Sequence, residues 1–363
     1  MGPLPTLDTA ETSRETPVSE RVSSPAWQRA WGESFRTARD LLQFLGLNPD
    51  RTAEPTGVRP DPTPSSTVDF DPAFPLRVPR AYAERMCHGD WNDPLLRQVL
   101  ARTSENIEAH GFTTDAVGDT AAQDGPAVLR KYKGRALLVL TGECAVHCRY
   151  CFRREYPYAD QALDRDAWEK VYTKLDADPE VEEILFSGGD PLSLSDAKLR
   201  WHFVRALRLA NLRRVRVHTR VPVVLPARVD ESFLSLIREV AAQKPFHLVL
   251  HINHTQEISP ALEAAAKALR SAGAILLNQS VLLRGVNDSV EALEALSLRL
   301  LDIGILPYYL HQLDRVRGAQ EFEVAEEEGM RLMNELRKRV PGYGLPRYVR
   351  EIAGEKSKTG ISG

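Results

Sequence analysis

The sequence of 363 residues has only four cysteines, no long apolar run and no strong excess of charge of either sign. An uninterrupted apolar stretch of roughly 20 residues is needed to span a bilayer, so we expect no contact with a membrane. The formal net charge is −3 and no long block of Lys and Arg occurs, so no nucleic-acid partner is expected either. The N-terminus lacks a basic segment followed by an apolar one, which predicts a cytoplasmic protein without a secretory signal.

The N-terminal third differs in composition from the rest of the chain. Residues 1–24 are rich in Pro, Ser, Thr and Glu with little apolar periodicity, which predicts a disordered tail. Apolar residues then recur at helical spacing in 25–47 and again in 79–101, and five prolines punctuate the segment 51–72 between them. We therefore expect an α-rich N-terminal region over 25–130 that contains a Pro-rich linker.

From residue 136 onward, short apolar runs rich in β-branched residues alternate with amphipathic segments, which is typical of repeated βα units around a parallel sheet. The expected strands are 136–141, 183–188, 214–219, 246–253, 275–283 and 305–313, and the expected helices are 164–175, 195–210, 230–243, 259–273 and 288–302. The fold class is therefore α/β, and an open doubly wound sheet and an incomplete barrel both fit this count. Polar residues gather in the C-terminal halves of the strands, where such folds build active sites; they include His218, His251, His254 and His311.

Three of the four cysteines fall in "GECAVHCRYCFRR", directly after the first expected strand, as Cys144, Cys148 and Cys151. Such crowding does not suit a disulfide framework and indicates a metal centre in a reducing compartment. A structural zinc site needs four ligands, and His147 is the nearby candidate for the fourth. Three thiolates instead suit an iron–sulfur cluster that keeps one iron open to a reacting ligand. Cys87 stands alone and is expected to be a half-buried thiol.

The C-x3-C-x2-C spacing, with Tyr150 before the last cysteine, resembles the radical S-adenosylmethionine (SAM) superfamily. The resemblance implies a 4Fe-4S cluster that binds SAM at its open iron, inside a partial (β/α)6 TIM-like barrel over residues 131–340. The second expected strand ends in "SGGDPL", where Gly188 and Gly189 let the backbone approach a ligand. In the superfamily this motif binds the methionine part of SAM, with Asp190 implied as acceptor of its ammonium group.

Most of residues 68–360 resembles the lysine 2,3-aminomutase family, which couples radical chemistry to pyridoxal 5'-phosphate (PLP). The resemblance is carried by "KYKGRALLVLTGECAVHCRYCFRREYPY", "FSGGDPLSLSD", "RVHTRVPVVLPARV", "NQSVLLRGVNDS", "PYYLHQLDRVRGAQEFEV" and "GEKSKT". It implies an isomerase that moves the 2-amino group of L-lysine to carbon 3, with an electron donor such as flavodoxin or ferredoxin. The third, fifth and sixth stretches are similar to the branch that makes (R)-β-lysine for elongation factor P.

The resemblance also assigns roles to PLP-binding residues. Lys358 in "SKT" matches the Schiff-base lysine, on a C-terminal tail of residues 341–363, and Lys356 is its rival. Lys131, Tyr132 and Arg135 match the group that binds the phosphate of the cofactor. These assignments follow from the match to the family motifs and not from spacing alone.

Three further residues are matched to the substrate. Arg153 is implied to grip the α-carboxylate, while Asp288 in "GVND" and Glu351 are implied to hold the distal ammonium. The catabolic lysine enzymes carry Asp where this chain has Glu351, so lysine preference is only loosely fixed. They also carry a zinc-binding C-terminal segment that this sequence lacks, so we expect no zinc and leave open whether the protein forms a homo-oligomer.

Several other functions fit the same residues. Within the family, the product could be free β-lysine for metabolism, or the substrate could be another amino acid such as glutamate. A radical SAM enzyme without PLP would make Lys358 a simple surface charge. A zinc-binding interaction protein without enzymatic activity is the alternative of a different class.

Overall fold

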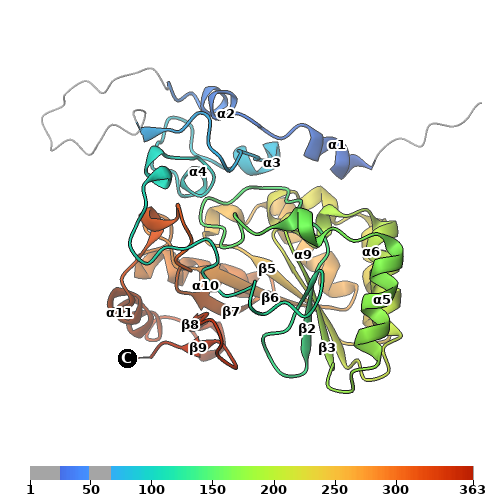
Figure 1. Ribbon diagram of the computed structural model, residues 1–363. Helices are drawn as coiled ribbons and strands as arrows, with labels where there is room; N and C mark the ends of the chain where they lie inside the picture. The colour runs from blue at the N-terminus through green and yellow to red at the C-terminus, as the bar shows by residue number, and fades with distance from the viewer. Residues whose placement is uncertain (1–24, 49–66, 363) are drawn as a thin grey trace, which may run out of the picture.

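The computed structural model describes residues 25–48 and 67–362. The expected disordered tail and residues 51–66 of the Pro-rich linker lie outside these residues. The described part contains one nine-stranded sheet whose strands follow each other in chain order, from β1 to β9 (Figure 1). Strands β2 to β8 run parallel, and β1 and β9 pair antiparallel at the two ends.

The six strands expected from the sequence are confirmed as β2 to β7. The bounds of the strands are Val128–Leu129 (β1), Arg135–Val139 (β2), Glu183–Ser187 (β3), Arg214–Thr219 (β4), Phe246–His251 (β5), Ala274–Val281 (β6), Leu306–His311 (β7), Arg347–Arg350 (β8) and Thr359–Gly360 (β9). A doubly wound sheet reverses its strand order at one point, and this sheet does not. The architecture is therefore the incomplete barrel, and β1, β8 and β9 were not anticipated.

The five helices expected between the strands are also confirmed. They are Arg165–Asp176 (α5), Asp196–Leu207 (α6), Glu231–Ala241 (α8), Pro260–Ser271 (α9) and Val290–Asp302 (α10). Each is preceded by an Asp or Ser whose side chain accepts a hydrogen bond from a first-turn amide, which fixes where the helix begins. A short helix, Val221–Val224 (α7), and another, Glu326–Leu336 (α11), add to the expected set.

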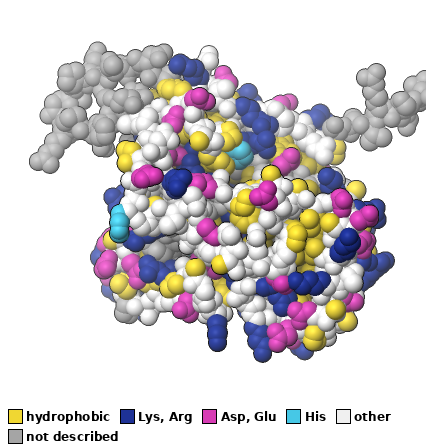
Figure 2. Space-filling model, viewed as in Figure 1, with side chains coloured by type: hydrophobic (Ala, Val, Ile, Leu, Met, Phe, Trp, Pro, Cys, Tyr) yellow, Lys and Arg dark blue, Asp and Glu magenta, His cyan; other side chains and the backbone are white. Residues whose placement is uncertain are grey.

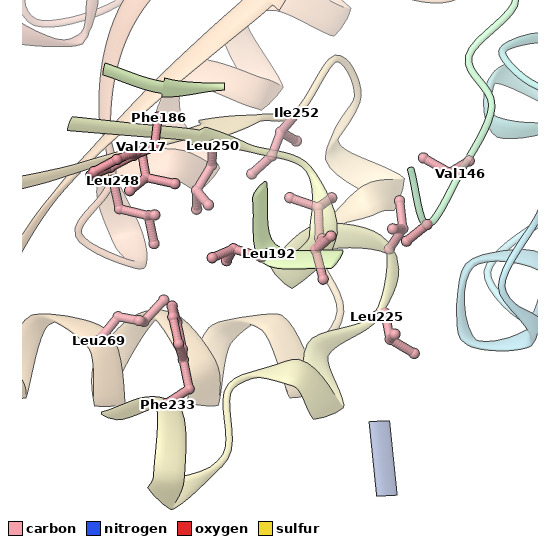
Figure 3. Close-up of a cluster of buried hydrophobic side chains, with 14 of the residues drawn as sticks. Val146, Phe186, Leu192, Val217, Leu225, Phe233, Leu248, Leu250, Ile252 and Leu269 are labelled. Carbon is pink, nitrogen blue, oxygen red and sulfur yellow. The ribbon is translucent and has the colours of Figure 1, made fainter. Parts of the chain in front are cut away.

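The main core lies between the strands and the helices outside them. Figure 3 shows Phe186, Val217 and Leu248, from β3, β4 and β5, opposite Phe233 of α8 and Leu269 of α9, with the two groups pointing toward each other. All five side chains are fully buried. Burial of each such side chain contributes about 1.5–3 kcal/mol relative to exposure. This packing holds the parallel strands in a rigid frame, and the loops at their carboxyl ends are positioned by it.

The N-terminal region is helical, but its helices are shorter than the periodicity suggested: Ala26–Gly32 (α1), Ala38–Phe44 (α2), Arg80–Ala83 (α3) and Pro94–Arg97 (α4). The first stretch is interrupted because Phe35 forms an antiparallel bridge with Val78 and Thr37 caps α2. The region lies along one side of the barrel (Figure 1). Arg85 donates to the carbonyl oxygens of Val223 (2.8 Å) and Glu257, which lie in the loops after β4 and β5. The N-terminal region thus covers the carboxyl ends of strands.

The visible surface mixes acidic and basic side chains, and Figure 2 shows Lys and Arg interspersed with Asp and Glu over this face. Among the described helices, none has the length and apolar character required to cross a membrane.

Candidate active site

A cavity of about 540 Å³ is lined by loops of the N-terminal region and by residues of the parallel strands and the loops that follow them. It brings together most of the site residues expected from the sequence. The expected site residues that line it are Cys144, Cys148, Cys151, Gly188, Gly189, Asp190, Arg153, Lys131, Tyr132, Arg135, Glu351 and Lys358. Asp288 and His147 do not line it.

The cysteine loop, residues 142–154, connects β2 to the segment before α5 and is held by the N-terminal region. The Arg149 amide donates to the Gln98 carbonyl oxygen (2.9 Å), and the buried Arg149 guanidinium pairs with Glu105 at 2.9 Å. The His147 amide donates to the Arg77 carbonyl oxygen at 3.0 Å. A loop without regular structure is thereby fixed through its backbone at several points, so that its three thiols face one cavity.

The surroundings of Cys144 and Cys151 disfavour their thiolate forms. Burial, together with neighbouring thiols, raises the pKa of Cys144 well above its usual value and that of Cys151 to about 11. A metal centre reverses this effect because its positive charge stabilises the thiolates. This chemistry fits the three residues as ligands of one metal cluster.

The geometry argues against a single zinc ion at the cysteines. Within residues 25–48 and 67–362, no three His, Cys, Asp or Glu side chains are arranged to hold one metal ion. His147, the expected fourth ligand, lies outside the cavity lining; its Nδ1 is 2.8 Å from the Pro75 carbonyl oxygen, and its ring stacks on Phe74. In a 4Fe-4S cluster each thiolate binds a different iron, so the sulfurs need not surround one point.

The glycines after β3 are required by close packing against the cysteine loop. Gly188 has a φ of +124°, and a Cβ atom there would lie 2.5 Å from the Thr141 carbonyl oxygen. A Cβ on Gly189 would lie 2.5 Å from the Glu143 carbonyl oxygen. The Gly189 amide donates to the Thr141 carbonyl oxygen at 2.7 Å. The Gly-Gly pair therefore places bare backbone beside the cysteines, where side chains would collide.

Asp190 has a different environment from the one implied by the resemblance. Its carboxylate accepts hydrogen bonds from the Thr219 hydroxyl (2.7 Å) and from the amides of Arg220 (2.6 Å), Val221 (3.1 Å) and Leu192 (3.0 Å). Burial raises its pKa to about 6, although these hydrogen bonds oppose the rise. Both oxygens are occupied by protein donors, so the carboxylate ties the loop after β3 to the end of β4. It is not a free acceptor for the ammonium group of SAM.

Lys358 enters the cavity because the C-terminal residues join the sheet. Strand β9 pairs with β8, and the two flank the turn that connects Glu351 to Lys358. Lys358 Nζ donates to Glu351 Oε2 at 2.7 Å, and the Tyr132 hydroxyl donates to Glu351 Oε1 at 2.6 Å. Lys356 is exposed and does not line the cavity. Of the two lysines, only Lys358 lies where its amine can reach a cofactor in the cavity.

Arg153 is held by a residue that the sequence analysis missed. Its Nε donates to Asp119 Oδ2 at 2.6 Å, and its Nη1 donates to the Ser187 hydroxyl at 3.1 Å. Asp119 Oδ1 lies 2.7 Å from Lys131 Nζ. Burial opposes ionisation of Asp119, but Arg153 and Lys131 hold its pKa below the usual value. This buried carboxylate thus orients two of the expected cationic residues, and nothing in its local sequence, "AVGDT", signalled that.

Asp314, just after β7, is a second residue that the sequence analysis missed. It lines the cavity. Burial raises the pKa of Asp314 to about 7. The nearby Lys358 lowers this pKa, and the nearby Glu351 raises it. Asp288, which was expected to hold the substrate ammonium, lies outside the cavity lining. The signal in the sequence is the polar end of the strand in "PYYLHQLD", where Asp314 follows His311 by three residues.

Comparisons with known proteins show what the chain is similar to. A model of the radical SAM superfamily matches residues 138–296. The chain is 45% identical over 286 residues to the L-lysine 2,3-aminomutase of Escherichia coli K12, covering 79% of this chain and 83% of that protein. It is 42% identical to the Haemophilus influenzae enzyme of the same name, over 79% and 84% of the two chains. The Clostridium subterminale enzyme is 32% identical, over 75% of this chain and 65% of that one.

The chain belongs to the lysine 2,3-aminomutase family of radical SAM enzymes. The cofactors of this family are a 4Fe-4S cluster, SAM and PLP. PLP requires a lysine amine and cationic groups for its phosphate. The cavity of this aminomutase family member offers Lys358 together with Arg135, and Arg216 and Arg347 are further cations in its lining. The residues present therefore fit the group.

Three histidines at strand ends complete the cavity of this lysine 2,3-aminomutase family member. His218, His251 and His311 line it, and burial lowers the pKa of each, that of His251 to about 3. They are therefore neutral at physiological pH. His218 Nε2 is buried without a hydrogen-bond partner among the described residues, which leaves it available to a bound ligand. His254 instead accepts a hydrogen bond from the Gln256 amide and lies outside the lining.

Proposed function

We propose that the protein converts L-lysine into β-lysine by moving the amino group from carbon 2 to carbon 3. The observation that carries the proposal is the single cavity that contains the three clustered cysteines, Lys358 and Arg153. In this chemistry the cluster with SAM supplies a radical that removes hydrogen, and PLP carries the migrating amino group. The protein must hold the amino acid between these groups and keep water away from the radical.

We infer that Arg153 binds the α-carboxylate of the substrate. Its guanidinium is buried and its orientation is fixed by Asp119 and Ser187. A planar guanidinium recognises a carboxylate through two parallel hydrogen bonds, which sets the angle as well as the position of the amino acid. The substrate would therefore be anchored at carbon 1, with carbons 2 and 3 presented to the reacting groups.

For the distal ammonium we propose the pair Glu351 and Asp314, in place of Glu351 and Asp288. Both members of the pair line the cavity, and Lys358 Nζ already occupies Glu351 at 2.7 Å as an ammonium group would. When Lys358 turns to the cofactor, its place at Glu351 is free for the ammonium of lysine. Two carboxyl groups at this point would repel the side chain of glutamate, so the arrangement favours lysine.

We further propose that the product is (R)-β-lysine for attachment to elongation factor P, made in the cytoplasm with flavodoxin or ferredoxin as the electron donor. The support is the sequence of three stretches that are similar to that branch of the family: "RVHTRVPVVLPARV", "PYYLHQLDRVRGAQEFEV" and "GEKSKT". Chiral analysis of the product, followed by transfer to purified elongation factor P by its ligase, tests this point. Formation of the S enantiomer, or failure of the transfer, would contradict it.

The main experiment is a substrate competition. The anaerobic, reduced enzyme loaded with cluster, SAM and PLP is incubated with lysine, glutamate and arginine together, and the β-amino acids are identified by mass spectrometry. We expect β-lysine as the main product. Cys148→Ala, taken through the same loading procedure, serves as the control and should form none. Glutamate as the preferred substrate would overturn the proposal.

A further inference from the structure

Arg220 lies directly after β4 and contacts one of the clustered cysteines. Its Nη1 is 2.7 Å from Cys148 Sγ, and its side chain is 6% exposed. The family motifs quoted above gave it no role. An arginine cannot lose its charge under physiological conditions, so a full positive charge is buried against a cluster ligand.

The guanidinium is fixed by four further groups. Nη1 also donates to the Tyr150 hydroxyl at 2.8 Å. Nη2 donates to Glu257 Oε2 (2.8 Å), Gln98 Oε1 (2.7 Å) and the Tyr82 hydroxyl (3.1 Å). Glu257 has no exposed surface, so the ion pair is fully inside the protein. The charge therefore has one orientation, with Nη1 toward Cys148 and the carboxylate bound to Nη2.

The N-terminal region contributes part of this arrangement. Tyr82 belongs to α3 and Gln98 caps the end of α4. The Gln98 amide group also donates to Glu257 Oε1 at 3.3 Å and to the Pro94 carbonyl oxygen at 3.1 Å. On the other side, Asn253 Nδ2 donates to Gln98 Oε1 (3.0 Å) and to the Tyr150 hydroxyl (2.7 Å). We call Tyr82, Gln98, Tyr150, Arg220, Asn253 and Glu257 the arginine network.

The charges of this network act on the electron that the cluster receives. A one-electron donor of low potential adds one negative charge to the cluster, and no bond forms or breaks in that step. Hydrogen bonds to the sulfurs and nearby net charge are among the features that set the potential of such clusters. The positive charge of Arg220 stabilises the added electron, and Glu257, which lies on the far side of the guanidinium, opposes it more weakly. Inside the protein these interactions are poorly screened.

We propose that Arg220 raises the reduction potential of the cluster through its hydrogen bond to Cys148, and that Glu257 limits this effect while fixing the guanidinium. Arg220 is thus a positioning residue that acts through Cys148. The inference deepens the proposed function and rests on the cluster that it requires, but not on the identity of the amino acid. Tyr82 and Gln98 make the N-terminal region part of the cluster's surroundings.

The test is a redox titration of the anaerobic holoprotein, followed by electron paramagnetic resonance, without lysine. We expect Arg220→Met to shift the midpoint potential to more negative values and Arg220→Lys to shift it less. Glu257→Gln should shift the potential to more positive values, and Tyr82→Phe should leave it within error of wild type. Arg228→Met is the matched control because Arg228 is also buried and donates to Asp196 and to the Leu192 and Leu194 carbonyl oxygens instead of a cysteine sulfur; it should not move the potential.

An unchanged potential in Arg220→Met, or shifts of the same sign in Arg220→Met and Glu257→Gln, would overturn the inference. If Arg220→Met does not assemble a cluster, the sign of the shift in Glu257→Gln decides the question. A weaker affinity for SAM with a constant potential would also overturn it, since Arg220 would then bind the coenzyme. The titration needs no lysine, so it tests the role of Arg220 separately from the choice of substrate. If the potentials shift as predicted but the protein forms no β-lysine, the proposed function is contradicted and the inference on Arg220 stands.

Discussion

The cavity joins two groups of residues that are assembled in different ways. The three cysteines come from eight consecutive positions of a single loop, Cys144 to Cys151. The residues proposed to bind PLP and the substrate come from distant parts of the chain: the hydrogen bond from Tyr132 to Glu351 spans 219 positions. The first group could be recognised from its spacing, whereas the second exists only when the sheet has formed. Damage to the two groups should therefore have separable effects.

The largest effect is expected at the cysteine loop. Cys148→Ala should abolish both cluster absorbance and turnover, because three thiolates are the minimum that hold the cluster. PLP absorbance should persist, since the residues proposed to bind PLP lie on other segments of the chain. Iron and sulfide analysis with ultraviolet–visible spectra measures this. Cys87 is exposed, not half-buried as expected from the sequence, and lies outside the cavity, so Cys87→Ala is the control. A full complement of iron in Cys148→Ala would contradict the assignment.

The second prediction breaks the other group and leaves the cysteines intact. Lys358→Ala should reduce turnover by about a thousandfold or more, because it removes the amine that forms the resting Schiff base. Borohydride reduction of the wild-type holoenzyme should fix the pyridoxyl label on Lys358, as peptide mapping would show. Lys356→Ala is the matched control and should keep nearly full activity. Label found on Lys356 alone would refute the role of Lys358.

Much of the fold could be predicted, because periodicity reports burial within one element. The six central strands and five helices follow from apolar spacing and capping residues. Strand β8 was missed since "RYVR" carries two charges in four residues, and β9 has only two residues. The break between α1 and α2 was missed because the bridge from Phe35 to Val78 is a tertiary contact.

The site was less predictable than the fold. Local spacing is sufficient for the cysteines and for the glycines, whose close packing leaves no room for a side chain. Asp119 acts only through Arg153 and Lys131, which are adjacent to it in space and not in sequence. Asp314 and Asp288 both follow strands, and only the fold shows that one of them lines the cavity.

The third prediction compares the effects of two carboxylates, Asp314 and Asp288, on lysine binding. Asp314→Asn should raise KM for lysine by about 10- to 100-fold, because a hydrogen bond to a charged group contributes about 1.5–3 kcal/mol. Asp288→Asn should change KM by less than about twofold, since surface substitutions alter free energies by about 0.5 kcal/mol at most. Steady-state kinetics of both variants decides between the two. A larger effect at Asp288 would restore the assignment made from sequence alone.

The smallest effect is a dependence on pH. Burial raises the pKa of Asp314 to about 7, so the group is largely protonated below that pH and ionised above it. Only the ionised form attracts the lysine ammonium, so KM for lysine should rise as the pH falls below about 7, by up to about tenfold per pH unit. The profile of Asp314→Asn should be flat over the same range. An equally steep profile in that variant would assign the titration to another group.

The cover that the N-terminal region places over the strand ends has a practical consequence. A fragment limited to residues 138–296, the span matched by the superfamily model, would lose Tyr82, Gln98, Arg77 and Glu105, and with them the backbone and side-chain anchors of the cysteine loop. Its sulfur ligands would open to solvent and to dissolved dioxygen. Such a truncated barrel should bleach in air far faster than the intact chain, and we expect the segment that carries Arg77, Gln98 and Glu105 to protect the cysteine loop from oxidation.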